Sequence, residues 1–185
     1  MTERTDTELV HDAIVGDRVA WEALVDRYSR LVWHVVHGYR QLDHDRRADV
    51  YQTVWLRLAE HLDRVRDPAR VGGWLATTAR NEAMRQLRLA GREQPTDEPD
   101  AAPVEHRLDR ALLDDERDAV LWDAFAKLKP QHQQLLRLLI ADPPLSYDEI
   151  ATVLDIPRGS IGPTRQRCLE ALRRMPGIAN LEGTS

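Results

Sequence analysis

The residues best suited to chemistry in this 185-residue sequence are arginines and hydroxyl side chains near its C-terminal end. The stretch 157–175 contains five arginines against one acid. Guanidinium groups bind phosphate and the edge of guanine, and hydroxyl groups can hydrogen-bond to either. These properties predict a surface that contacts nucleic acid, and its candidate contact residues are Arg158, Ser160, Thr164, Arg165 and Arg167.

Two short helices around a turn would position this basic stretch. "SYDE" at 146–149 is a capping box, in which Ser146 and Glu149 close the start of a helix. Asp155 then tolerates the left-handed backbone of a tight turn, and the apolar residues within 150–161 would wedge the two helices apart. The pattern predicts a helix-turn-helix whose second helix enters the major groove. The alternative is an ordinary helical hairpin inside a bundle core.

Two prolines complicate the start of the second helix. Pro157 suits a first helical turn, because its missing N–H would have no partner there. Pro163 would instead cost a hydrogen bond to the carbonyl of Gly159. The sequence therefore predicts either a kink at Pro163 or a regular helix that begins only near Ser160.

A second basic segment covers residues 64–92, with seven arginines against two acids. Residues 91–119 hold ten acids against four arginines, and this strip accounts for the negative net charge of −5. Phosphate responds to local field rather than to total charge, so two basic patches around an acidic strip indicate partner binding. Solvated, arginine-rich helix faces are the alternative explanation for both patches.

Apolar side chains recur at spacings of three and four through residues 9–36, 46–62 and 72–90, which is the period of amphipathic helices. We expect a break at Gly16-Asp17, and Gly91 as the C-cap of the third stretch.

Prolines among acids, without large apolar side chains, then predict a linker that cannot bury a core. The expected fold class is all-α: two small helical domains joined by a flexible acidic linker, the second domain containing the helix-turn-helix. The expected ranges are a first domain at 1–91, a Pro-rich linker at 92–107, a second domain at 108–176 and a tail at 177–185.

The order of these segments resembles bacterial RNA polymerase sigma factors of the extracytoplasmic-function (ECF) group, which keep only conserved regions 2 and 4. "GDRVAWEALVDRYSRLVW" is similar to the opening of region 2, and "RRADVYQTVWLRLAEHL" to the stretch that docks on the polymerase clamp helices. "WLATTARNEAMRQLR" is similar to the segment that faces the minus-10 promoter element, and "LSYDEIATVLDIPRGSI" to the minus-35 reader of region 4. Trp55 stands where the group more often has phenylalanine, and "SIGPTRQRC" where it often has a V-K-S-R run, so the promoter sequence is not implied.

The resemblance implies a sigma factor, and not an enzyme, that binds core RNA polymerase and directs promoter-specific initiation without a cofactor or metal. The polymerase contacts would be Asp49, Val50, Gln52, Thr53, Trp55 and Arg57. The minus-10 contacts would be Arg64, Arg66, Asp67, Trp74, Arg80, Asn81, Arg85 and Arg88. Along one predicted helix, Arg80, Arg85 and Arg88 could reach successive phosphates. The loop before Trp74 could surround an unstacked base.

The minus-35 contacts would be Arg158, Ser160, Thr164, Arg165 and Arg167. The acidic linker would mimic nucleic acid in a basic channel of the polymerase. An anti-sigma factor is a further partner that the group allows. Trp55 could also be a core residue.

Several simpler features restrict which class of protein this can be. No run of about 18 apolar residues exists, and the start "MTERTDTELV" lacks the apolar core of a signal peptide. Cys168 is the only cysteine, which excludes an intrachain disulfide, and we expect it to pack inside rather than to sense redox state. These features predict a cytoplasmic protein without membrane insertion.

Three alternatives stay open. His34 and His37, with Glu60 or His61, could ligate a metal, although half-buried or solvated histidines are the simpler explanation. The chain could be a stand-alone helix-turn-helix regulator whose first domain dimerises or binds a ligand. It could also be a helical adaptor without DNA contact. Transcription with core polymerase would separate the last two from a sigma factor.

Overall fold

The computed structural model describes residues 4–93, 116–175 and 178. All regular structure in these ranges is helical, which confirms the all-α prediction. The helices are α1 (Asp6–Ile14), α2 (Arg18–His37), α3 (His44–His61), α4 (Val71–Glu93), α6 (Glu116–Ala126), α7 (Pro130–Leu139), α8 (Tyr147–Leu154) and α9 (Arg158–Arg173), with short 3-10 turns η1 (Leu62–Arg64) and η2 (Pro68–Arg70).

The first domain is built around α2, which packs against α1, α3 and α4. Its fully buried side chains recur at helical spacing and include Leu24, Leu31 and Val32. The predicted break is confirmed: α1 ends before Gly16, whose φ of 92° few other residues adopt, and Asp17 caps α2 by accepting the N–H of Val19 at 2.9 Å.

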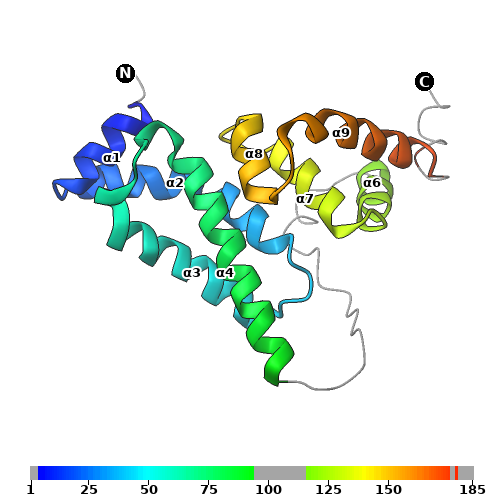
Figure 1. Cartoon of the computed structure of the whole chain (residues 1–185), viewed down its shortest axis with the longest axis horizontal. Coiled ribbons are helices and arrows are strands. Elements are labelled where there is room, and N and C mark those ends of the chain that lie inside the picture. Colours follow the sequence, from blue (N-terminus) through cyan, green and yellow to red (C-terminus); the bar gives the residue numbers. More distant parts are fainter. Residues whose placement is uncertain (1–3, 94–115, 176–177, 179–185) are drawn as a thin grey trace.

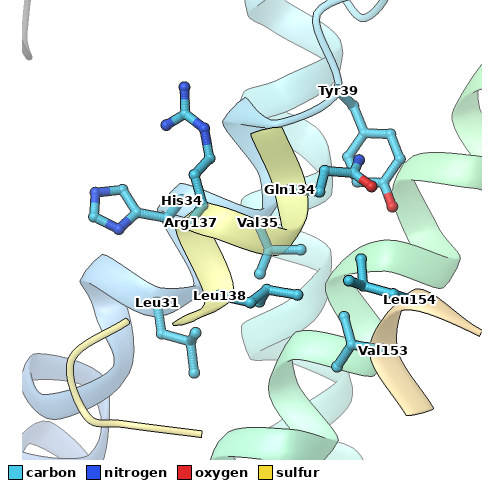
Figure 2. Close-up of a pocket in the computed structure, with 9 residues that line it drawn as sticks. All are labelled: Leu31, His34, Val35, Tyr39, Gln134, Arg137, Leu138, Val153 and Leu154. Carbon is cyan, nitrogen blue, oxygen red and sulfur yellow. The ribbon is translucent and has the colours of Figure 1, made fainter. Parts of the chain in front are cut away.

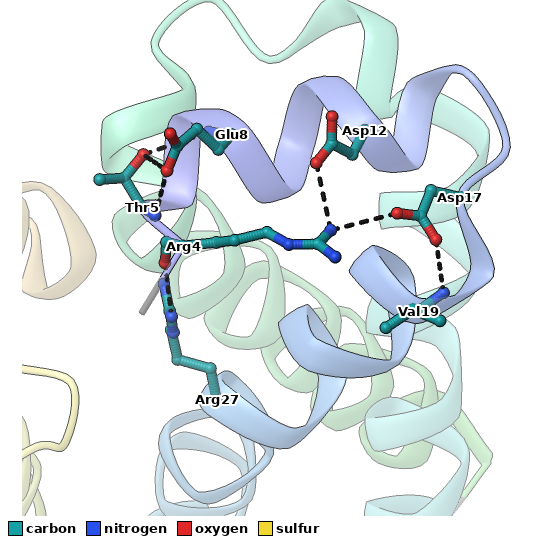
Figure 3. Close-up of polar contacts among 7 residues, drawn as sticks. All are labelled: Arg4, Thr5, Glu8, Asp12, Asp17, Val19 and Arg27. Carbon is teal, nitrogen blue, oxygen red and sulfur yellow. Dashed lines mark hydrogen bonds and ion pairs between the residues drawn. The ribbon is translucent and has the colours of Figure 1, made fainter. Parts of the chain in front are cut away.

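Ion pairs fasten the start of the chain onto α2 (Figure 3). Arg4 Nη1 lies 3.1 Å from a carboxylate oxygen of both Asp12 and Asp17. Arg27, on α2, donates to the carbonyl of Arg4 at 2.8 Å and to Asp6 at 2.7 Å. The hydrogen bond from Arg4 is the main cause of the lowered pKa of Asp17, so this carboxylate is ionised at neutral pH.

The second domain contains the helix-turn-helix, as predicted. Ser146 Oγ accepts the N–H of Glu149, and Glu149 Oε2 accepts the N–H of Ser146 at 2.8 Å, which completes the capping box of α8. Asp155 forms the turn in left-handed conformation, with φ 55° and ψ 50°. Ile150 and Ile161 are fully buried between the two helices, as the wedge requires.

Two details of the helix boundaries differ from expectation. The second helix, α9, runs unbroken from Arg158 with Pro157 as its N-cap, so the predicted start near Ser160 is wrong and no interruption marks Pro163. Pro163 has no N–H, so the hydrogen bond that is lost is the one to the carbonyl of Gly159, which lies in the first turn of the helix. Gly91 is not a C-cap, because α4 continues to Glu93, and a single glycine costs a helix only about 1 kcal/mol.

Cys168 is buried, and burial raises the pKa of its thiol, which agrees with the predicted packing role. The linker predicted for 92–107 lies outside the described residues beyond the last turn of α4. So does the tail at 177–185, apart from Ile178.

The two domains touch along two contacts, α7 against α2 and α8 against α4 (Figure 1). One apolar core passes through both contacts, because Leu135 and Leu138 of α7 and Ile150 and Val153 of α8 join the buried residues of the first domain.

Replacing Asp155 by glycine should stabilise the protein. Left-handed backbone costs an L-residue about 1–2 kcal/mol and costs glycine little, so we expect Asp155→Gly to raise the free energy of unfolding by about 0.5–1 kcal/mol. Thr152→Gly, at an exposed position inside α8, is the control and should lower it by about 0.3–0.5 kcal/mol. Urea denaturation measures both changes, and equal losses would show that residue 155 is not left-handed in solution.

Candidate nucleic-acid and polymerase interfaces

The residues expected to contact polymerase lie on α3. Asp49, Gln52 and Arg57 are exposed, whereas Thr53 and Trp55 are half-buried. The ring of Trp55 stands edge-on to Tyr51, with centroids 6.0 Å apart, so Trp55 belongs partly to the core and partly to the surface.

Two residues of α3 change the expected surface. Val50 is fully buried, because Val50, Val54 and Leu58 recur every four residues and form the core face of α3. Its assignment to the polymerase surface is therefore corrected to a packing role. Leu56 was missed: it is 63% exposed, and its spacing from Gln52 and Asp49 places it on their face of the helix.

One buried carboxylate connects α3 to α4. Glu82 is only 3% exposed and accepts hydrogen bonds from Arg57 of α3 at 3.1 Å and from Arg85 of α4 at 2.6 Å. The sequence predicts Arg57 as a polymerase contact and Arg85 as a minus-10 contact. Glu82 fixes their guanidinium groups side by side, and its role could have been inferred from its place among the arginines of α4.

The loop between α3 and α4 forms a pocket of about 330 Å³. This volume is within the range of small-ligand sites. Four of its lining residues had been assigned to the minus-10 element, namely Arg64, Arg66, Asp67 and Trp74. Arg70 was missed; the turn η2 places its Nε 3.3 Å from Asp67, so that a carboxylate and a guanidinium lie at one wall.

The arginines of α4 do not form the expected row. Arg80 lines a cleft against the second domain, whereas Arg85 points to Glu82 and α3. Five residues turn a helix by about 140° beyond one full turn, which separates these two side chains. Asn81 and Arg88 are exposed on the same helix.

The predicted contact residues of α9 fall on two opposite flanks. Arg158 and Arg165 share one flank, and Arg158 Nε lies 3.3 Å from Asp148 of α8. The other flank, Ser160, Thr164 and Arg167, lines the cleft between the domains, and Arg167 donates to Thr164 Oγ1 at 3.0 Å.

The outermost face of α9 lies between these flanks. It presents Gly159, Pro163 and Gln166, all exposed, while Ile161 and Cys168 face the core. Gln166 was missed as a candidate reader of base edges. Its side chain donates to Glu170 at 3.1 Å, and its position midway between the two flanks was available from helical periodicity.

Of the histidines considered for a metal site, His37 makes an aromatic contact. His37 stacks on Trp33 with ring centroids 3.6 Å apart, and its Nδ1 lies 3.0 Å from the carbonyl oxygen of Trp33. Across residues 4–93, 116–175 and 178, no three His, Cys, Asp or Glu side chains are grouped to hold a metal ion. Within the same ranges, no helix has the length and apolar character needed to cross a membrane.

Comparison with known proteins gives matches over most of the chain. The family model for sigma-70 region 2 matches residues 24–93, and the model for sigma-70 region 4 matches residues 124–174. The RNA polymerase sigma-H factor of Pseudomonas aeruginosa is 27% identical over 93% of this chain and 94% of its own length. The ECF RNA polymerase sigma-E factor of Escherichia coli K12 is 27% identical over 91% of this chain and 92% of its own.

Solved structures share the fold. CnrH, in complex with the cytosolic domain of CnrY, has a TM-score of 0.60 at 21% identity, covering 97% of this chain and 99% of that one. The sigma factor RpoE of Bartonella quintana, in complex with the anti-sigma factor NepR, has a TM-score of 0.58 at 18% identity, covering 82% and 93%. Because regions 2 and 4 together occupy most of the sequence, in the order that ECF sigma factors have them, this chain belongs to the sigma-70 family, in its ECF group.

Proposed function

We propose that this sigma factor captures a base of the minus-10 element in the pocket between α3 and α4, reads the minus-35 element with α9, and binds core RNA polymerase with α3. As an ECF sigma factor it directs promoter recognition with RNA polymerase, and sigma factors are DNA-binding initiation factors rather than enzymes. The observation that supports the residue assignment best is the loop pocket, where four side chains predicted for the minus-10 element converge. We place this activity in the cytoplasm, where transcription takes place.

The pocket offers the contacts that an unstacked base requires. Trp74 supplies an aromatic face for stacking, which is sequence-tolerant and strong. Asp67 supplies carboxylate oxygens, which accept hydrogen bonds from an exocyclic amine such as that of cytosine. Arg64, Arg66 and Arg70 surround these two groups with positive charge for the backbone phosphates.

The outer face of α9, between its two basic flanks, has little side-chain bulk. Gly159 and Pro163 add little bulk, so the helix can lie deep in the major groove with Gln166 directed at base edges. Arg165 on one flank and Arg167 on the other would then contact phosphates of the two strands.

The decisive experiment is transcription in vitro with core polymerase and a promoter library of random sequence. A sigma factor gives promoter-specific transcripts only when core enzyme is present. A stand-alone regulator would instead bind its operator tightly without polymerase, and an adaptor would give neither result. The absence of any specific transcript would reject the proposal.

Trp74→Ala should weaken the binding of single-stranded minus-10 DNA to the holoenzyme by about 1–3 kcal/mol, because base stacking is lost. Trp74→Phe keeps an aromatic ring and should retain most of the affinity. Fluorescence anisotropy with labelled single strands measures both. Binding of a duplex that carries only the minus-35 element should be unchanged, and an equal loss on that duplex would contradict a local role for Trp74.

Gln166→Ala and Arg165→Ala should weaken minus-35 binding in different ways. Loss of a base contact at Gln166 should remove about 1–3 kcal/mol of discrimination at one base pair. Loss of a phosphate contact at Arg165 should weaken all sequences alike and reduce the salt slope by about 1. Holoenzyme binding to a panel of minus-35 variants at several salt concentrations measures both. A uniform loss for Gln166→Ala would remove it from the reading surface.

Leu56→Ala should weaken the complex with core polymerase by about 1–2 kcal/mol, because an exposed leucine becomes buried in the interface. Val19→Ala is the matched control, since Val19 is 62% exposed on α2, outside the proposed surface. Changes at Asp49 and Gln52 should also weaken the complex. Co-purification with core enzyme tests all four, and an undiminished complex in the folded Leu56, Asp49 and Gln52 variants would exclude this face of α3.

A further inference from the structure

The cleft between the domains is large enough to hold a small molecule. Its volume is about 540 Å³, which is within the range of small-ligand sites. The first domain contributes the residues after α2 and the middle of α4, and the second contributes the start of α7, the end of α8 and one flank of α9. The outermost face of α9, with Gly159, Pro163 and Gln166, is not part of the lining. A molecule bound here therefore contacts both domains without using that face.

The charged side chains that line this cleft are all basic. Arg80 of α4 and Arg167 of α9 line it from the two domains, together with His132 of α7, and none of its lining residues in the described chain is Asp or Glu. Within the ranges that the structure describes, neither guanidinium is paired with a carboxylate, although Arg80 is half-buried. Partial burial of a charge is costly unless a counter-ion accompanies it. An anion in the cleft would supply that counter-ion.

Two neighbouring side chains respond to this positive charge. Burial lowers the pKa of His132, and the positive charges of Lys129 and Arg167 lower it further, so the ring is neutral at neutral pH. Burial raises the pKa of Tyr39, whereas the positive charge of Arg80 opposes that shift. The cleft is therefore electropositive on the wall formed by the first domain and on the wall formed by the second.

The start of α7 adds the positive end of a helix dipole to the cleft. Pro130, Gln131 and His132 form the first turn of this ten-residue helix, and all three line the cleft. The N-cap residue is Lys129, whose side chain makes no capping hydrogen bond, whereas α8 has the hydroxyl of Ser146 in this position. The N-terminus of a helix attracts anions and is a common place for phosphate to bind. An external phosphate would complete this end of α7.

The rest of the lining combines apolar and hydrogen-bonding side chains, as a nucleoside requires. Its apolar members, which could contact the faces of a base, are Met84, Leu87, Leu135, Leu154 and Ile156. Amides that could bind the edge of the base lie on Gln41 and Gln134, and Figure 2 shows the second of these beside Tyr39. Thr164 Oγ1 accepts a hydrogen bond from Arg167, so its own proton can be donated to a phosphate oxygen.

We propose that this cleft binds a nucleoside polyphosphate. The phosphates lie among Arg80, Arg167 and the start of α7, and the base lies against the apolar side chains of α4 and α8. Two guanidinium groups, Lys129 and the helix end match the charge of a di- or triphosphate better than that of a single phosphate. The inference goes beyond the proposed function, because the ligand needs neither DNA nor polymerase, and it holds whether or not the two arginines also contact a promoter.

Isothermal titration calorimetry of the full-length protein with ATP and with GTP tests the site, in buffer that contains EDTA so that no metal ion contributes. We expect at least one of the two to bind with a Kd below about 100 µM. The matching nucleoside and inorganic tripolyphosphate should each bind at least about tenfold more weakly, because each lacks part of the contacts. Absence of binding by both nucleotides at about 1 mM would overturn the proposal. Tripolyphosphate that binds as tightly as the nucleotide would overturn the assignment to a nucleoside.

Single substitutions locate the binding site. Arg80→Gln and Arg167→Gln should each weaken nucleotide binding at least about fivefold, because each removes a cation beside the phosphates. Arg88→Gln on α4 and Arg165→Gln on α9 are the matched controls, since both residues are exposed on the same helices and neither lines the cleft. These controls make the same change of net charge and should leave the affinity within about twofold of the parent.

The variant at Arg167 keeps the test decisive. Its side chain is exposed, so Arg167→Gln retains the fold, and circular dichroism verifies this for all four variants. Equal nucleotide affinity in Arg167→Gln and the parent would place the ligand outside the cleft and overturn the proposal. An equal loss in Arg165→Gln and Arg167→Gln would also overturn it, because general attraction to a basic helix would then explain the binding.

Failure of the proposed function would look different. Calorimetry involves neither DNA nor polymerase, so it tests the cleft whatever α4 and α9 contact in a promoter. If the variants show the expected pattern and core polymerase gives no promoter-specific transcript, the proposed function fails and the nucleotide site stands. If Arg80→Gln lowers promoter-specific transcription but leaves nucleotide binding unchanged, the nucleotide site fails and the minus-10 assignment of Arg80 stands.

Discussion

The burial of α2 is the constraint on which the rest of the structure depends. Its apolar face, which includes Leu24, Leu31 and Val36, holds α1, α3 and α4 around it. Val35 near its C-terminal end, and Tyr39 just beyond that end, also take part in the contact with the second domain. The orientations of α3, which is proposed to meet polymerase, and of the α3–α4 loop, which is proposed to meet DNA, both follow from the way those helices pack on α2. A cavity in this core would thus disturb surfaces that it does not touch.

The surfaces proposed for polymerase and for DNA are physically connected through Glu82. A carboxylate with almost no exposure needs its partners, since loss of a hydrogen bond to a buried charge is costly. Arg57, on the face proposed for polymerase, and Arg85, on the face proposed for DNA, satisfy the same group. If one arginine moves toward an external partner, the other must satisfy more of the hydrogen bonding of Glu82. The two proposed faces of this domain therefore share one buried carboxylate.

Local patterns predicted much of the fold. The capping box of Ser146 and Glu149, the break at Gly16 and the left-handed Asp155 all arise from interactions within a few residues, and the structure confirms each of them. The start of α9 could not be predicted from Pro163 alone, because the rest of the helix is held by Ile161 and Cys168 in the core and outweighs one lost hydrogen bond. Tertiary packing decided that boundary.

The candidate sites were predictable by residue type more than by arrangement. Arg64, Arg66, Asp67 and Trp74 meet in one pocket because they are close in sequence. The burial of Val50, the exposure of Leu56 and the divergence of Arg80 from Arg85 depend on the rotation of whole helices about their axes. The contact between the domains joins segments distant in sequence, and no local pattern marks Gly73, whose Cβ position lies 2.6 Å from Glu149 of α8, as part of it.

The paired glycines at the start of α4 also affect how easily the helix unwinds. Gly72 and Gly73 together lower the helix propensity of the first turn by about 2 kcal/mol relative to alanines. Contacts outside the helix hold this turn in shape, since both glycines are buried and a Cβ on Gly72 would lie 2.8 Å from Cε1 of Tyr28. The wall of the loop pocket that carries Trp74 therefore rests on a turn whose helical form depends on its neighbours more than on its own sequence, at the site proposed to accept an unstacked base.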